Sequence, residues 1–139
     1  MKISKKAEYA MRAIIKIARS KQNKPLQISE ISKTESIPIK FLEQILLSLK
    51  NNGILYSKRG ANGGYLLAKS SAQISIGMIL RVIDGQFDPI GLLSGNHLSK
   101  GLEKCFEDMA EIINKHLNSV TIENILEIEE SKDSIAFDI

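Results

Sequence analysis

Residues 28–68 of this chain, ISEISKTESIPIKFLEQILLSLKNNGILYSKRGANGGYLLA, carry the pattern that decides its fold. Two short amphipathic segments, residues 28–34 and 38–51, flank the tripeptide SIP at residues 36–38. Pro38 disfavours helix at the residue before it but is tolerated in a first helical turn, so a tight turn is expected there. A basic, glycine-rich hairpin follows directly. This order predicts a helix-turn-helix with a wing, a geometry that places one helix in the major groove of DNA and a loop beside it.

The second helix of this pair, residues 38–51, has one apolar side and one polar side, and Asn52-Gly53 is a typical end signal after it. The apolar side belongs in the core and comprises Leu42, Ile45, Leu46 and Leu49. The opposite side carries Lys40, Glu43, Gln44 and Leu47. Glutamate accepts a hydrogen bond from cytosine, glutamine pairs with adenine, and lysine suits guanine or phosphate, so we expect this side to recognise base edges. Two roles are open for Leu47: contact with a thymine methyl group, or packing against a neighbouring element.

The wing is predicted from two short strands, residues 54–58 and 64–68, around a turn rich in glycine. Arg59 and Lys58 stand at its base, and a narrow minor groove attracts such an arginine through its negative potential. A phosphate-binding loop is the alternative, but the spacing matches neither G-x-G-x-x-G nor G-x-x-x-x-G-K-[ST], and no helix follows directly. With the start of the chain included, the candidate DNA-binding residues are Ser4, Lys5, Lys40, Glu43, Gln44, Ser57, Lys58, Arg59, Gly60 and Asn62.

The net charge of +3 is unevenly distributed along the chain. Residues 1–69 contain 14 Lys or Arg and 4 Asp or Glu, a local charge of +10, whereas residues 70–139 contain 5 basic and 12 acidic residues, a local charge of −7. A basic half that contains the helix-turn-helix is the electrostatic footprint of phosphate contact. We therefore expect the acidic half to face away from DNA.

Other classes of protein find little support in the sequence. The basic and apolar start of the chain is interrupted by Glu8, Arg12 and Lys16 and lacks a small-residue cleavage site, so it does not predict a targeting sequence. No stretch approaches the roughly 20 apolar residues of a membrane span. The lone cysteine, Cys105, fits a reducing compartment, and we expect a cytoplasmic protein. No nucleophile–base pair, metal-ligand spacing or phosphate loop indicates an enzyme.

The remaining segments predict a mostly α-helical chain in which a long helix follows the DNA-binding head. Residues 4–20 form a first helix capped by Ser4, residues 75–84 a fourth helix stopped by Gly85, residues 98–119 the long helix, and residues 121–129 a short one. The expected organisation is a winged helix-turn-helix domain at 1–85, a loop at 86–97, a dimerisation element at 98–128 and a disordered acidic tail at 129–139. Apolar residues at three- and four-residue steps predict a dimer surface on the long helix, made of Leu98, Leu102, Cys105, Phe106, Met109, Ile112, Ile113 and His116. Burial of this stripe within one chain is the alternative.

Cys105 and the two histidines have structural and functional interpretations. A lone cysteine on an apolar helical stripe is usually a small hydrophobic residue, and the alternative is a thiol redox switch at the dimer surface. His116 is expected in the core or interface. His97, just before the long helix, is expected to cap it rather than to bind metal, so we expect no metal site.

The chain resembles the bacterial winged-helix regulators that include the iron–sulfur biogenesis regulator IscR, the nitric-oxide sensor NsrR and the cysteine-metabolism repressor CymR. The resemblance covers about residues 1–128 and is carried by KISKKAEYAMRAI, FLEQILLSLKNNGIL, KRGANGGYLLA, ISIGMILRVIDG and TIENIL. It implies a homodimeric DNA-binding transcription factor, usually a repressor, that binds a pseudo-palindromic operator. The family's recognition positions fall on Lys40, Glu43 and Gln44, and its minor-groove arginine on Arg59. Many members have a small residue where this chain has Lys40, which favours a phosphate contact there.

The resemblance departs from the family's pattern at the sensor. Cluster-binding members carry three cysteines in and just after the loop before the long helix, whereas residues 86–105 of this chain offer Cys105 alone. One thiolate with His97 nearby cannot replace the four protein ligands that a cluster normally takes. We therefore expect no cofactor and place the chain nearest the clusterless, CymR-like branch. Two alternatives remain: a thiol- or metal-responsive regulator, and a protein-interaction module acting with a metabolic enzyme or other effector.

Overall fold

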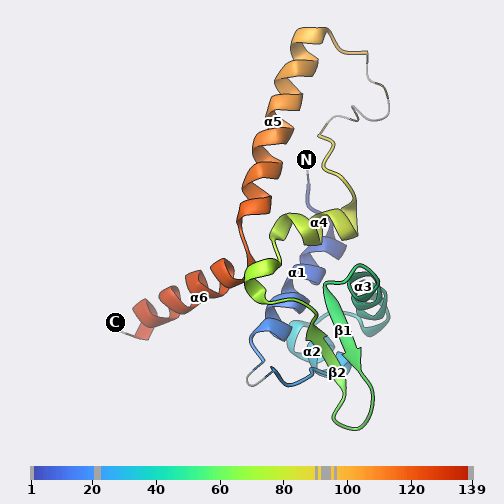
Figure 1. Cartoon of the computed structure of the whole chain (residues 1–139), viewed down its shortest axis with the longest axis vertical. Coiled ribbons are helices and arrows are strands. Elements are labelled where there is room, and N and C mark those ends of the chain that lie inside the picture. The colour runs from blue at the N-terminus through green and yellow to red at the C-terminus, as the bar shows by residue number, and fades with distance from the viewer. Residues whose placement is uncertain (1, 21–22, 90, 92–94, 96, 138–139) are drawn as a thin grey trace.

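Helix α1, Lys5–Ala18, lies at the centre of residues 2–85, called the head below, in the computed structural model of the chain (Figure 1). The structure describes residues 2–20, 23–89, 91, 95 and 97–137. Ser4 caps α1 as predicted, because its hydroxyl oxygen accepts a hydrogen bond from the Ala7 amide at 3.0 Å. One side of α1 is fully or almost fully buried and consists of Ala7, Ala10, Ala13, Ile14 and Ile17. Through this side α1 contacts α2, α3, α4 and the second strand of the wing.

The helix-turn-helix consists of α2, Ile28–Glu35, and α3, Ile39–Asn51, as the sequence predicted. Ser36 takes the left-handed conformation with φ 55°, and Ile37 turns inward, with 2% of its surface exposed. The Ser32 hydroxyl donates to the Ile37 carbonyl at 2.6 Å and holds the turn closed. The four predicted core residues of α3 are all fully buried, namely Leu42, Ile45, Leu46 and Leu49.

The wing is a two-stranded antiparallel sheet of β1, Leu55–Lys58, and β2, Gly64–Leu67, in the register Leu55↔Leu67 to Lys58↔Gly64. A bridge that the sequence did not reveal attaches it to the head. Leu26 and Tyr65 exchange two backbone hydrogen bonds, Leu26 N to Tyr65 O at 3.0 Å and Tyr65 N to Leu26 O at 2.8 Å. The mostly helical fold with a β-wing is thus confirmed.

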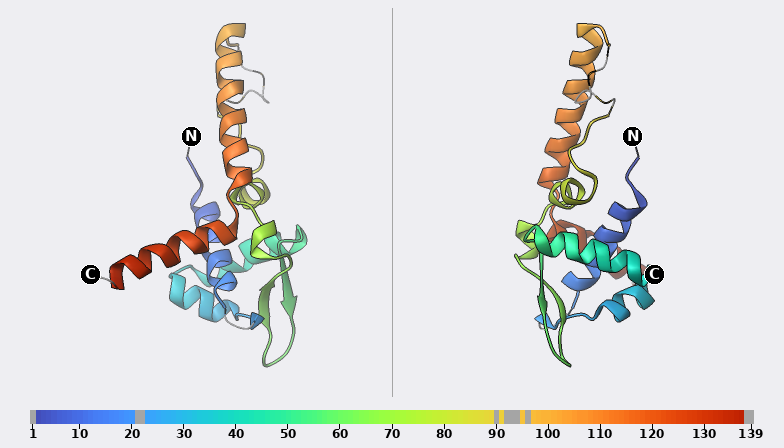
Figure 2. Two further views of the ribbon diagram at one scale, coloured as in Figure 1. Left: turned by 60° about the vertical axis from the view of Figure 1, so that its left-hand side comes forward. Right: turned by 90° about the vertical axis from the view of Figure 1, so that its right-hand side faces the viewer.

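The second half of the chain contains the single turn η2, Ser71–Gln73, and helices α4, Ile76–Asp84, α5, Lys100–Ser119, and α6, Ile122–Phe137. Helix α4 starts and stops where predicted, at a Ser75 cap and at Gly85. Helix α5 stands away from the head in every view (Figures 1 and 2). No helix in the part of the chain that the structure describes is long and apolar enough to cross a membrane.

The largest differences from the sequence analysis concern the boundaries of α5 and α6, while other helix ends shift by one or two residues. Helix α5 begins at Lys100 instead of residue 98, because Ser99 is extended and its hydroxyl accepts from the Leu102 amide; Leu98 therefore precedes the helix. Helix α6 continues to Phe137 instead of giving way to a disordered tail after residue 129. No proline or glycine interrupts this stretch, and Arg19 forms an ion pair with Glu129 that joins α6 to the end of α1. Residues 90, 92–94 and 96 of the predicted loop and 138–139 of the predicted tail lie outside the described residues.

We expect Gly64→Ala to destabilise the protein by more than about 2 kcal/mol and Gly60→Ala by about 1 kcal/mol. Both glycines have positive φ, +146° and +111°, so both substitutions strain the backbone. Only at Gly64 would the new Cβ lie 2.4 Å from the Leu26 carbonyl oxygen, whereas nothing lies within 4 Å at Gly60. Urea unfolding at one protein concentration measures the difference. Equal losses for the two variants would show that the Leu26 bridge does not constrain the wing.

Candidate nucleic-acid interface

The outer side of α3 brings together the residues predicted to recognise bases. Lys40, Glu43 and Gln44 are all exposed, and they stand opposite the four buried leucines and isoleucines of the same helix. Leu47 lies on this side with 52% of its surface exposed, which favours contact with a ligand over packing in the protomer. Because a major-groove helix must present donors, acceptors and apolar groups together, this side matches what base recognition requires.

Sequence reasoning missed Ile39 as a member of this surface. It is the first residue of α3, is 44% exposed, and stands one helical turn before Glu43 on the same side. The four-residue spacing to Glu43 was available in the sequence, but an isoleucine at a helix start is usually assigned to the core. Its exposure adds a second apolar group beside Leu47.

The wing presents the second set of predicted residues. Lys58, Arg59, Gly60 and Asn62 are exposed, and Ser57 is half-buried on β1. The tip closes through a hydrogen bond from the Gly63 amide to the Gly60 carbonyl at 2.9 Å. A Cβ at residue 63 would lie 2.2 Å from the Lys58 carbonyl oxygen, so this close turn needs glycine.

Gln27, which sequence reasoning did not single out, supports the wing tip from outside. Its Nε2 donates to the carbonyl of Ala61 at 3.3 Å, next to the Leu26–Tyr65 bridge. The wing is thus tied to the chain segment that precedes α2. No local pattern signals a one-residue bridge, so the sequence could not have revealed it.

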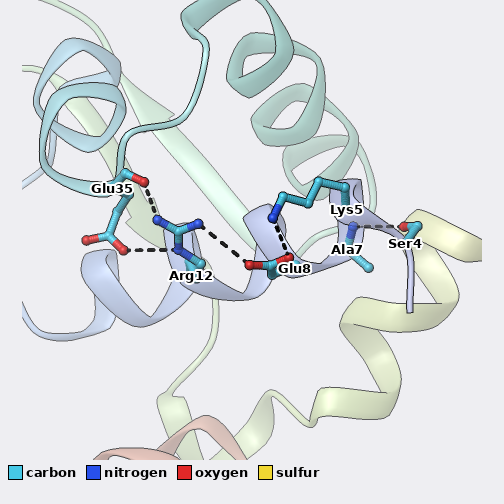
Figure 3. Close-up of polar contacts among 6 residues, drawn as sticks. All are labelled: Ser4, Lys5, Ala7, Glu8, Arg12 and Glu35. Atoms are coloured by element: carbon cyan, nitrogen blue, oxygen red, sulfur yellow. Dashed lines mark hydrogen bonds and ion pairs between the residues drawn. The ribbon is translucent and has the colours of Figure 1, made fainter. Parts of the chain in front are cut away.

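Ser4 and Lys5 lie at the start of α1, and this end of the helix points away from the wing tip (Figure 1). The Ser4 hydroxyl already makes two hydrogen bonds, because it caps α1 and donates to Asp84 at the end of α4. The Ser4 amide donates to the same carboxylate at 3.2 Å. Lys5 is exposed, and its Nζ lies 3.1 Å from Glu8 Oε2 (Figure 3). The same Nζ lies 5.3 Å from the centre of the Tyr9 ring. A phosphate would compete with Glu8 for this lysine.

About half of the predicted dimer stripe on α5 is exposed in the single chain, and the rest is half-buried. No described residue of α5 is buried, Leu102 and Ile112 are 51% and 69% exposed, and Cys105 and His116 are also exposed. The half-buried members are Leu98, which precedes the helix, and Phe106, Met109 and Ile113. Within one chain the stripe is therefore only partly covered. On the exposed side of α5, Lys104 donates a hydrogen bond to Asp108, and this bond raises the pKa of Lys104.

In the part of the chain that the structure describes, no group of three or more His, Cys, Asp or Glu side chains gathers in a way that could hold a metal ion.

A recognition helix with an exposed polar side, followed by an anchored β-wing, defines a winged helix-turn-helix DNA-binding protein. The chain belongs to the Rrf2 family, described as an iron-dependent transcriptional regulator, whose profile matches residues 3–128. It is thus a DNA-binding transcriptional regulator and not an enzyme.

Comparisons with individual proteins, by sequence and by structure, support this assignment. The chain is 30% identical over 138 residues to the HTH-type transcriptional regulator IscR of Pectobacterium carotovorum, an alignment that covers 96% of this chain and 84% of that protein. Its fold matches that of CymR, the global cysteine regulator of B. subtilis, with a TM-score of 0.81 and 28% identity over 92% of this chain and 98% of that one. It also matches T. potens IscR with a TM-score of 0.79 and 27% identity over 95% and 90% of the two chains. The similarities thus extend to both branches, and the assignment stands at the level of the family.

We expect Arg59→Ala to weaken binding to a specific duplex by tenfold or more, since a base or phosphate contact by arginine contributes about 1–3 kcal/mol. Glu43→Ala should instead relax the choice of base at one position in each half-site, because it removes an acceptor for cytosine. Competition binding with single-base variants of a duplex selected by the wild-type protein measures both effects. Lys132→Ala, which removes an exposed cation from α6, is the control. If both variants bind like the control, the interface has been assigned to the wrong surface.

Proposed function

We propose that this protein is a homodimeric repressor that binds a pseudo-palindromic operator in the cytoplasm and blocks transcription there. Residues 1–85 bind DNA, and residues 98–128 form the dimer. The observation that carries the proposal is the exposed side of α3, where Lys40, Glu43 and Gln44 stand together beside the wing. Two such helices about 34 Å apart in a dimer would reach successive major grooves on one face of DNA.

The second copy of the chain is the occupant that we propose for the apolar stripe of α5. Leu102 and Ile112 on the amphipathic helix α5 are both more than half exposed. Contiguous apolar surface of this kind on a soluble protein often marks an interaction site. A two-fold contact between identical stripes would cover both copies at once. The part of the stripe within α5 runs from Leu102 to His116, which is long enough for a helix-to-helix contact.

The distribution of charge supports one orientation on DNA. The +10 half of the chain contains α3 and the wing, and the −7 half contains α5 and α6. Helix α5 rises on the side of the head opposite the wing tip (Figure 2). In this orientation phosphate meets the basic half, while the acidic half stays away from DNA and is available to a protein or small-molecule effector.

The proposed regulator works without an iron–sulfur cluster, although the family description mentions iron. Cys105 is the one cysteine of the sequence, and it lies exposed on α5. A cluster normally needs four protein ligands, which this chain cannot supply from cysteine. A second candidate is regulation by oxidation of this thiol, which would disturb packing at the dimer stripe.

Binding to a duplex selected from a randomised pool, compared with a scrambled duplex of the same length, tests sequence-specific recognition. We expect the selected duplex to bind at least 10³-fold more tightly at physiological salt, and both affinities to fall as salt rises. Equal affinity for the two duplexes would contradict the proposal and leave only a nonspecific DNA-binding protein.

Absorbance of the anaerobically purified protein tests the absence of a cluster. We expect no band between about 300 and 500 nm and no stoichiometric iron, because cysteine ligands are too few. A band in this region accompanied by iron would overturn the cluster-free assignment, without affecting the recognition of DNA.

A further inference from the structure

Arg12 on α1 contacts the end of α2, where the turn of the helix-turn-helix begins. The guanidinium of Arg12 donates through Nη2 to the main-chain carbonyl of Glu35, the last residue of α2. Its Nε lies 3.6 Å from Glu35 Oε1, and its Nη1 lies 3.8 Å from Glu8 Oε1 (Figure 3). A single side chain therefore connects the middle of α1 to the end of α2.

This position favours arginine over lysine for a physical reason. The last carbonyls of a helix have no partner within the helix and carry the negative end of its dipole. The turn that follows includes Ser36 at φ 55°, a conformation that costs energy for a residue other than glycine. A planar guanidinium can bond the carbonyl and face two carboxylates at once, whereas an ammonium group on a flexible stem cannot hold this arrangement.

Two aromatic rings, those of Tyr9 and Phe41, connect the same guanidinium to the recognition helix. It lies 5.6 Å from the centre of the Tyr9 ring, and that ring meets Phe41 edge to face at 5.6 Å and 81°. Phe41 is in the first turn of α3, directly beside Lys40. Arg12 is thus in contact with the end of α2 and, through Tyr9, with the start of α3.

We propose that Arg12 is a positioning residue for base recognition, which sets the angle at which α3 meets the major groove. The proposal rests on the sequence-specific function proposed above. Base contacts tolerate little misplacement, whereas phosphate contacts by flexible lysines tolerate much more. Loss of Arg12 should therefore lower discrimination between DNA sequences more than it lowers general affinity for DNA.

Direct phosphate contact is the competing role, because 37% of the Arg12 side chain is exposed. The two roles differ in their dependence on salt. A phosphate contact weakens binding to all sequences alike and reduces the slope of log affinity against log salt by about one. A positioning residue leaves that slope unchanged and reduces the ratio of specific to nonspecific affinity.

The test measures affinities of the full-length protein for the selected and the scrambled duplex across a range of salt. The variants are Arg12→Gln, which removes the charge and most donors, and Arg12→Lys, which keeps the charge. Lys16→Gln is the matched control, because Lys16 is one turn further along α1 and makes none of these contacts. Urea unfolding of each variant, done in parallel, reports the fraction folded under the binding conditions.

We expect Arg12→Gln to lower the specificity ratio about tenfold, with the scrambled-duplex affinity and the salt slope unchanged. Arg12→Lys should shift the ratio in the same direction, and Lys16→Gln should leave it within twofold. If Arg12→Gln does not fold, Arg12→Lys carries the test alone. An unchanged ratio, or equal weakening on both duplexes with a smaller slope, would overturn the positioning role. Failure of the wild-type protein to discriminate would instead refute the proposed function itself.

Discussion

The architecture depends on close packing around α1, which three alanines make feasible. Ala7, Ala10 and Ala13 are completely buried, and their small side chains let neighbouring elements approach the helix axis. Helices α2, α3, α4 and α6 and strand β2 all contact α1. The relative placement of recognition helix, wing and C-terminal helices is therefore set from one central element, and polar contacts such as those of Arg12 refine it.

Much of this arrangement was predictable, because it is encoded in local periodicity and in residues that restrict the backbone. The burial of Leu42 and the exposure of Glu43 follow from helical spacing, and Pro38 and Gly53 mark the limits of α3. The Leu26–Tyr65 bridge was not predictable, because it joins residues distant in sequence through backbone atoms alone. Helix α6 continues past residue 129, where a disordered tail was expected, and no proline or glycine in that stretch interrupts a helix.

The candidate site shows the same division between local and tertiary information. The residues on α3 and in the wing could be assigned from spacing and from a family resemblance, and the structure leaves them exposed except for the half-buried Ser57. Ser4 was assigned to DNA, yet its hydroxyl is bonded to Asp84 and the α1 amide. The contribution of Arg12 became visible only when the fold brought the end of α2 beside α1. The part of the protein that recognises DNA is consequently better defined than the signal that regulates it, for which the chain offers one exposed thiol.

The central claim is that a dimer of this chain recognises DNA through two α3 helices and two flanking wings. Hydroxyl-radical and guanine-methylation footprinting on a selected duplex tests it most directly. The account predicts two protected major-groove segments whose centres are about 10–10.5 base pairs apart, or a multiple of this, with minor-groove protection beside each. A single protected segment, or uniform protection with no major-groove guanines involved, would contradict it.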